Sequence, residues 1–147
     1  MDELTEIAKQ LPFTEHGAPR LALLKKAYEI ADQENLTDYQ IDMRLDYIDE
    51  ATFYDDIMLI YVLFPEVLKL HDKQVEEKGH CAMTYRVMWE YKWLLEHAVE
   101  FYQISIGQFE AICADFQERC QHLAYSMKTS YQYQFMFYMY CNEEKAQ

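Results

Sequence analysis

Hydrophobic positions recur at helical spacing along most of this chain. The clearest stripe falls between residues 81 and 102 and consists of Val87, Tyr91, Leu94, Ala98 and Phe101. Spacing of three or four positions marks one face of an α-helix, so a long amphipathic helix is predicted there. The same pattern predicts helices over residues 2–11, 19–35, 37–53, from 55 or 56 to 78, and 105–123, and a seventh capped by Ser126. The predicted apolar face includes Ile41, Leu45 and Ile48 in the helix over residues 37–53, and Phe109 and Phe116 in the helix over residues 105–123.

Turn and capping residues mark the ends of these helices. Thr37 with Gln40, and Ser105 with Gln108, each form a predicted capping box, in which a hydroxyl at the helix start and an amide three residues later satisfy each other's backbone donors. Gly79 is the predicted C-terminal stop of the helix before it. The helices are therefore joined by short connections.

Glycine and proline are scarce, with three of each in 147 residues. A sheet protein needs turn residues about every 8 to 12 positions, so the scarcity favours helices. The segment from Tyr131 to Phe137 alternates like a strand, but a single strand among helices has nothing to pair with. We therefore predict an all-α fold of about seven helices, arranged as antiparallel pairs in the manner of an α-solenoid.

Composition and charge narrow the class of partner. Hydrophobic residues make up 51% of the chain, enough for the core of one domain, and the net charge is −13. This field repels nucleic acid and anionic membranes and favours basic partners. The N-terminus lacks the basic and apolar regions of a secretion signal, and the longest apolar run, from Ile57 to Pro65, is far shorter than a membrane span. The predicted location is the cytoplasm.

Residues for catalysis or metal binding form no recognisable motif. Cys81, Cys113, Cys120 and Cys141 have no framework spacing, and we expect reduced, buried thiols. The histidines form no metal-ligand pair, and no nucleophile elbow or phosphate-binding loop is present. The prediction is a protein that is not an enzyme and that uses no metal and no cofactor.

The strongest local anomaly is an acidic stripe, defined as Asp38, Asp42, Asp46 and Asp49. These residues lie four, four and three positions apart, so they share one side of the predicted third helix. Glu50 adds to their charge. The stripe is either a solvated outer face or a surface that receives lysine or arginine side chains.

Two groups of aromatic residues are further candidates for contact with partners. Trp89 and Trp93 lie one helical turn apart and either pack against a neighbouring helix or form a binding hot spot. The last predicted helix carries aromatic residues around its circumference, Tyr131, Phe135 and Tyr138 among them. We expect some of them to pack on a further repeat or on another copy of the chain.

Residues 24–31 are Leu-Lys-Lys-Ala-Tyr-Glu-Ile-Ala, a stretch that is similar to the second helix of a tetratricopeptide repeat. Residues 53–68 resemble an elbow with its second helix, and residues 141–146, Cys-Asn-Glu-Glu-Lys-Ala, are similar to the family's elbow. The resemblance implies a helical-repeat domain over residues 19–147 that ends in mid-repeat, preceded by a short helix and linker over residues 1–18. It also implies a groove, lined by first helices, that holds a peptide or a partner helix.

Together these observations predict a protein- or peptide-binding helical-repeat module with an acidic groove surface. The alternative is an acidic protein that imitates the phosphate spacing of DNA and inhibits a nucleic-acid-binding protein. The predicted binding residues are Asp38, Asp42, Asp46, Asp49, Glu50, Trp89 and Trp93.

Overall fold

The computed structural model describes residues 2–54, 56–98 and 104–123 of the chain. These residues form helices and no strand, so the all-α prediction is confirmed for them. The elements are α1 (Asp2–Gln10), the 3₁₀ turn η1 (Leu11–Phe13), α2 (Ala18–Gln33), α3 (Thr37–Tyr54), α4 (Leu59–Lys78), α5 (Thr84–Ala98) and α6 (Ile106–Cys120). The predicted seventh helix, with Tyr131, Phe135 and Tyr138, lies outside the described residues.

The chain divides into two compact units, Met1–Val87 and Met88–Gln147. The first unit contains α1, η1, α2, α3, α4 and the first turn of α5. The second contains the rest of α5 and α6.

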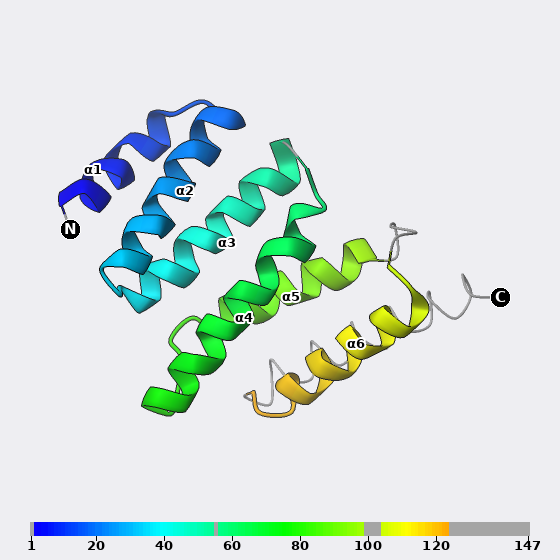
Figure 1. The fold of residues 1–147 in the computed structure, drawn as a ribbon. Helices are drawn as coiled ribbons and strands as arrows, with labels where there is room; N and C mark the ends of the chain where they lie inside the picture. The colour runs from blue at the N-terminus through cyan, green and yellow to red at the C-terminus, as the bar shows by residue number, and fades with distance from the viewer. Residues whose placement is uncertain (1, 55, 99–103, 124–147) are drawn as a thin grey trace. The chain divides into compact units, whose positions relative to one another are not determined.

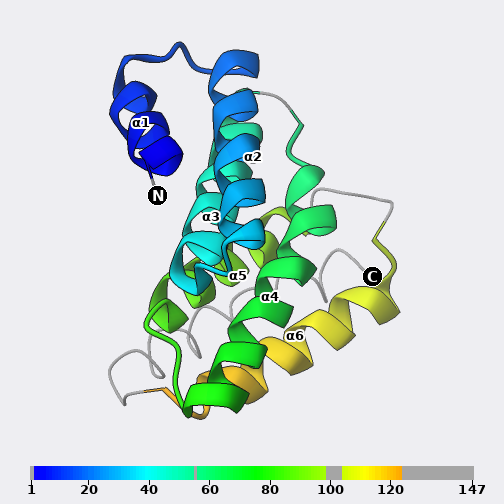
Figure 2. The same cartoon turned by 60° about the vertical axis from the view of Figure 1, so that its left-hand side comes forward.

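In the first unit, α1 to α4 lie side by side in chain order, and successive helices run in opposite directions (Figure 1, Figure 2). The stripe predicted for α3, formed by Ile41, Leu45 and Ile48, is completely buried. Ala27 and Ala31 of α2 are also fully buried, and their small side chains allow close approach of a neighbouring helix. The predicted antiparallel pairing of neighbouring helices is therefore present in this unit.

The N-terminal helix α1 packs on α2 through a small apolar cluster. Leu4 and Ile7 of α1 meet Ala27 and Ile30 of α2, and all four side chains are buried. Pro12 then lies in η1, so the chain leaves α1 through a tight turn before α2 begins. Residues 2–33 therefore form a helical hairpin in which α1 covers one side of α2.

Arg44 of α3 connects three helices. Its side chain is only 9% exposed, and its two terminal nitrogens donate to the Asp32 carboxylate of α2 at 2.8 and 2.6 Å. Its Nε donates to Glu66 of α4 at 3.3 Å, and the guanidinium lies 4.6 Å from the centre of the Tyr28 ring. Because the hydrogen bond from Arg44 favours the ionised carboxylate, the pKa of Asp32 is lowered.

The boundaries of α4 follow from its flanking residues. Asp56 Oδ1 accepts a hydrogen bond from Met58 N at 2.9 Å, so a turn precedes the helix, which begins at Leu59 and not at residue 55 or 56 as predicted. The predicted stop at Gly79 is confirmed. Its φ of +81° lies in the left-handed region that glycine adopts without strain.

Of the two predicted capping boxes, one is confirmed and one is wrong. Ser105 Oγ accepts from Gln108 N at 3.1 Å, and Ser105 N donates to Gln108 Oε1 at 2.9 Å. At the start of α3, the Leu36 carbonyl accepts from Gln40 N, so Leu36 and not Thr37 is the capping residue. The side chain of Gln40 instead donates to Asp32 of α2 at 3.1 Å.

In the second unit, the buried residues of α5 and α6 are largely the predicted ones. Leu94 and Ala98 of α5 are buried, as are Phe109 and Phe116 of α6. The Tyr91 hydroxyl of α5 donates to Asp115 Oδ2 of α6 at 2.8 Å. This hydrogen bond satisfies the only polar atom of a buried tyrosine side chain and links the two helices.

The prediction of buried, unpaired thiols is confirmed for Cys81, Cys113 and Cys120, and Cys141 lies outside the described residues. Burial raises the pKa of Cys113 and of Cys120 to about 12. Within the described ranges, no helix has the length and apolar character needed to cross a membrane.

Candidate functional site

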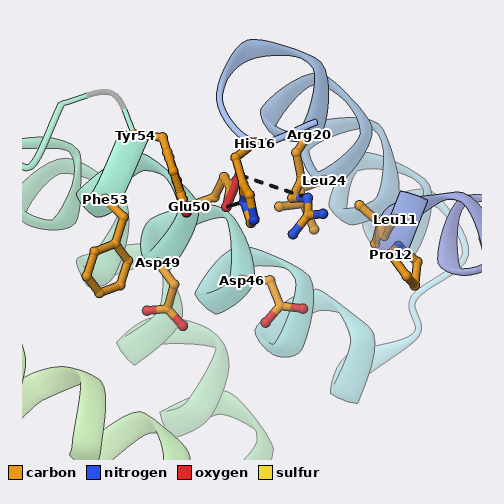
Figure 3. Close-up of a pocket in the computed structure, with 10 residues that line it drawn as sticks. All are labelled: Leu11, Pro12, His16, Arg20, Leu24, Asp46, Asp49, Glu50, Phe53 and Tyr54. Atoms are coloured by element: carbon orange, nitrogen blue, oxygen red, sulfur yellow. Dashed lines mark hydrogen bonds and ion pairs between the residues drawn. The ribbon is translucent and has the colours of Figure 1, made fainter. Parts of the chain in front are cut away.

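A cavity of about 470 Å³ lies in the first unit, where α2 begins and α3 ends (Figure 3). We call it the α2–α3 cavity. Its apolar and aromatic lining comes from Leu11, Pro12, Leu24, Phe53 and Tyr54, and its charged or titratable lining from His16, Arg20, Asp46, Asp49 and Glu50. The cavity can therefore accept a ligand that has both an apolar and a cationic part.

Glu50 holds the wall of the cavity in place. Its side chain is 8% exposed, and Oε1 accepts hydrogen bonds from His16 Nδ1 at 2.8 Å and from the Gly17 backbone N–H at 3.1 Å. Arg20 Nε lies 3.9 Å from Glu50 Oε1, within ion-pair distance, and a dashed line in Figure 3 marks this pair. Glu50, predicted as a binding residue, thus anchors the linker between η1 and α2.

The linker residues are oriented to meet Glu50. Gly17 has a φ of +93°, a conformation that other residues rarely adopt, and this presents its N–H to the carboxylate. Arg20 Nη2 donates to the Thr14 carbonyl at 2.7 Å. The His16 ring stacks on Tyr54, with 4.4 Å between ring centres. These contacts fix one rim of the cavity.

The acidic stripe is occupied by side chains of the same chain. Arg86, in the first turn of α5, contacts Asp42 through Nη1 and Asp46 through Nη2, and its Nη2 lies 3.8 Å from Asp49 Oδ2. Asp38 Oδ1 accepts from the Gln74 amide at 3.1 Å. A single guanidinium therefore lies against three of the four carboxylates.

These ion pairs remain accessible to water. The side chains of Arg86, Asp42, Asp46 and Asp49 are 34–40% exposed. Partial burial, assisted by the charge of Asp49, raises the pKa of Asp46 to about 6. The carboxylates of the stripe therefore still repel one another, and the positive charge of Arg86 reduces this repulsion.

The aromatic residues of the cavity are more exposed than is usual for residues of their size. Phe53 is 65% exposed and Tyr54 53%, and both lie in the last turn of α3, three and four residues after Glu50. In Figure 3, Asp49 and Phe53 lie next to each other along α3. An apolar ring beside a carboxylate is a surface that suits a basic segment with an apolar side chain.

Comparisons with protein-family models, with curated proteins and with solved structures found no match to this chain. Function must therefore be argued from the geometry and chemistry of the site, because a helical architecture by itself does not define an activity.

Trp89 and Trp93, the other predicted binding residues, belong to the second unit. Trp89 is 44% exposed, and Lys92 Nζ lies 4.4 Å from the centre of its ring. Trp93 is half-buried and meets the edge of the His97 ring. Each indole therefore has a neighbour on its own helix.

A hydrogen-bonded chain at the start of α5 was not predicted. His71 Nε2 lies 2.9 Å from Thr84 Oγ1, and His71 Nδ1 lies 3.0 Å from Asp72 Oδ1. The order resembles a nucleophile, base and carboxylate, but Thr84 Oγ1 also donates to the Cys81 carbonyl at 2.8 Å. Burial raises the pKa of the Cys81 thiol, opposite to the shift of an activated cysteine. The arrangement ties the segment before α5 to α4.

Sequence reasoning found the carboxylates of the site but missed their counter-charge. Arg86 is the only lysine or arginine between Lys78 and Lys92, yet nothing in its neighbourhood along the chain points to Asp42, forty-four residues away. His16 and Arg20 were missed for the same reason. Pro12 and Gly17, which bracket a loose segment, were the only sequence signal of the linker that forms the rim.

Proposed function

We propose that this protein is a binding module for another protein, and that the α2–α3 cavity receives a basic segment of the partner that also carries an apolar side chain. The observation that carries the proposal is the combination, in one cavity, of two exposed aromatic rings with two carboxylates, Asp46 and Asp49. The rings offer apolar area, and the carboxylates select for positive charge.

The surrounding architecture supports this role. Antiparallel neighbours from α1 to α4 are the arrangement expected of a tetratricopeptide-like repeat, and we propose that the module belongs to that structural class. Such helical stacks present rigid surfaces to their ligands. The contacts of Glu50 with His16 and Gly17 would keep the cavity open before a partner arrives, which lowers the entropic cost of binding.

Imitation of DNA, the alternative predicted from the sequence, has weaker support. A DNA mimic presents unneutralised charges in rows, in the manner of phosphates. Here, the positive charge of Arg86 lies against Asp42, Asp46 and Asp49 and partly neutralises them. These three carboxylates therefore do not form a row of unneutralised charges.

Selection from a random peptide library with the full-length chain tests the proposal. We expect the enriched peptides to contain arginine or lysine next to an aromatic or aliphatic residue. Phe53→Ala should weaken the best of them by about tenfold, equivalent to about 1.4 kcal/mol, because the exposed ring supplies apolar contact. Affinity is measured by fluorescence anisotropy of the labelled peptide.

Val62→Ala is the matched control for this measurement. Val62 is 65% exposed, the same fraction as Phe53, but it belongs to α4 and does not line the cavity. Its substitution should leave the affinity unchanged. The proposal is wrong if no basic and apolar consensus is enriched, or if Phe53→Ala and Val62→Ala have equal effects.

A further inference from the structure

Arg86 reaches the α2–α3 cavity without lining it. It contacts Asp46 and approaches Asp49, which both line the cavity, and it also contacts Asp42, which does not. The guanidinium thus lies against two of the carboxylates that would attract a basic partner. One cation of the chain already occupies the place where a second one would bind.

The contacts of Arg86 depend on the shape of its guanidinium. Nη1 contacts Asp42 while Nη2 contacts Asp46, so the two ends of one planar group bridge carboxylates one helical turn apart. An ammonium group is a compact point charge and cannot bridge two carboxylates in this way. The stripe is therefore built to hold arginine in preference to lysine.

The same contacts are open to exchange. All four side chains are more than a third exposed, and ion pairs at such positions hold weakly because water competes for both partners. Replacing one guanidinium by another leaves the number of ion pairs unchanged. The apolar contacts with Phe53 and Tyr54 then favour the incoming segment.

We infer that Arg86 is an internal competitor, which occupies the acidic stripe until an arginine of the partner displaces it from Asp46 and Asp49. This inference rests on the proposed binding function and adds to it the identity of the recognised side chain and a built-in restraint on affinity. The partner binds only to molecules in which Arg86 has moved away from Asp46 and Asp49. The smaller the fraction of such molecules, the weaker the apparent affinity for the partner.

The test uses the full-length chain and a fluorescein-labelled peptide, Gly-Arg-Leu-Phe-Gly-Gly, with lysine and citrulline versions as controls. Arg86→Gln should bind the arginine peptide about tenfold more tightly than the natural chain, as expected if Arg86 occupies the stripe about nine-tenths of the time. The lysine peptide should bind more weakly than the arginine peptide, and the citrulline peptide more weakly still.

Asp42→Asn separates displacement from simple charge attraction. This substitution removes a negative charge, so attraction alone predicts weaker binding of the basic peptide. Displacement predicts tighter binding, because Arg86 loses a contact while Asp46 and Asp49 of the cavity remain. Arg86→Lys keeps the positive charge but loses the planar guanidinium that contacts two carboxylates, so this variant should also bind the arginine peptide more tightly than the natural chain. Circular dichroism of each variant checks that the helices are retained.

The outcomes distinguish the two proposals. If the arginine peptide binds the natural chain and Phe53→Ala weakens it, but Arg86→Gln and Asp42→Asn bind equally or more weakly, the competitor role of Arg86 is wrong and the binding function stands. If no variant binds the arginine peptide better than the citrulline peptide, both are wrong.

Discussion

Two charged side chains of α3, Arg44 and Glu50, are buried and each holds a neighbouring element. Arg44 joins α3 to Asp32 of α2 and Glu66 of α4, and Glu50 holds the linker before α2. Burial of a charge is costly unless it is paired and hydrogen-bonded, and both side chains meet this condition. At the residue scale, specific polar contacts therefore set the register of the helices.

The lowered pKa of Asp32 predicts how stability depends on pH. Because the folded-state pKa lies below the ordinary value of 3.8, the contribution of Asp32 is present above that pH and is lost as the pH falls through the folded-state pKa. Asp32→Asn should lower the free energy of unfolding at pH 7 by about 1 kcal/mol, since it weakens charge-assisted hydrogen bonds from Arg44. Urea unfolding at several pH values measures the difference.

The difference between Asp32→Asn and the natural chain should shrink as the pH falls below 3.8. Glu29→Gln, an exposed acid on the same helix, serves as the control and should have little effect at any pH. A pH-independent loss in Asp32→Asn would show that the side chain stabilises the fold by its shape and not by its charge.

At the scale of the element, two similar capping motifs form different contacts in the structure. Ser105 and Gln108 form their capping box at the start of α6, whereas Gln40 turns away from Thr37 to meet Asp32 of α2. A local hydrogen bond forms only where no tertiary partner competes for the same side chain. The first residue of a helix is therefore predicted most reliably from the sequence where that end of the helix is exposed to solvent.

Capping by Ser105 predicts a measurable contribution to stability. Ser105→Ala should lower the free energy of unfolding by about 1 kcal/mol, because the backbone N–H of Gln108 loses its acceptor. Ser105→Asn should retain most of the stability, since asparagine also caps helices well. Thr37→Ala should cost less than Ser105→Ala, because Thr37 lies inside its helix. Equal losses at the two positions, measured by urea unfolding, would contradict the assigned caps.

At the scale of the whole molecule, the chain forms two compact units whose interiors both contain free thiols. Cys81 belongs to the first unit, and Cys113 and Cys120 belong to the second. Since all three are buried, a reagent reaches them only when the surrounding helices open. Thiol chemistry therefore reports the opening of each unit separately.

Alkylation by iodoacetamide at pH 8 should be slow at these cysteines in the native protein. With a pKa of about 12, on the order of one thiol in ten thousand is ionised at Cys113 and Cys120, and the thiolate is the reactive form. Peptide mass spectrometry gives the rate at each site, and the same protein in urea supplies the unfolded reference. Native alkylation of Cys113 or Cys120 at the unfolded rate would contradict the burial described for the second unit.

The periodic pattern of this sequence determined the helices and their buried faces. Ile41, Leu45 and Ile48 of α3, and Phe109 and Phe116 of α6, are buried as predicted, because an amphipathic helix can satisfy its apolar stripe in only one orientation. The acidic stripe also followed from spacing alone. Local rules sufficed where the relevant neighbours lie within one or two helical turns and no tertiary partner competes for the same side chain.

Tertiary structure alone decided which charges meet. The partner of Asp42 is Arg86, that of Glu50 is His16, and that of Arg44 is Asp32, and none of these pairs lies within one helix. Helical periodicity specifies which way a side chain points but not which distant segment faces it. The cavity, and with it the proposed function, therefore arises from the order in which the helices stack.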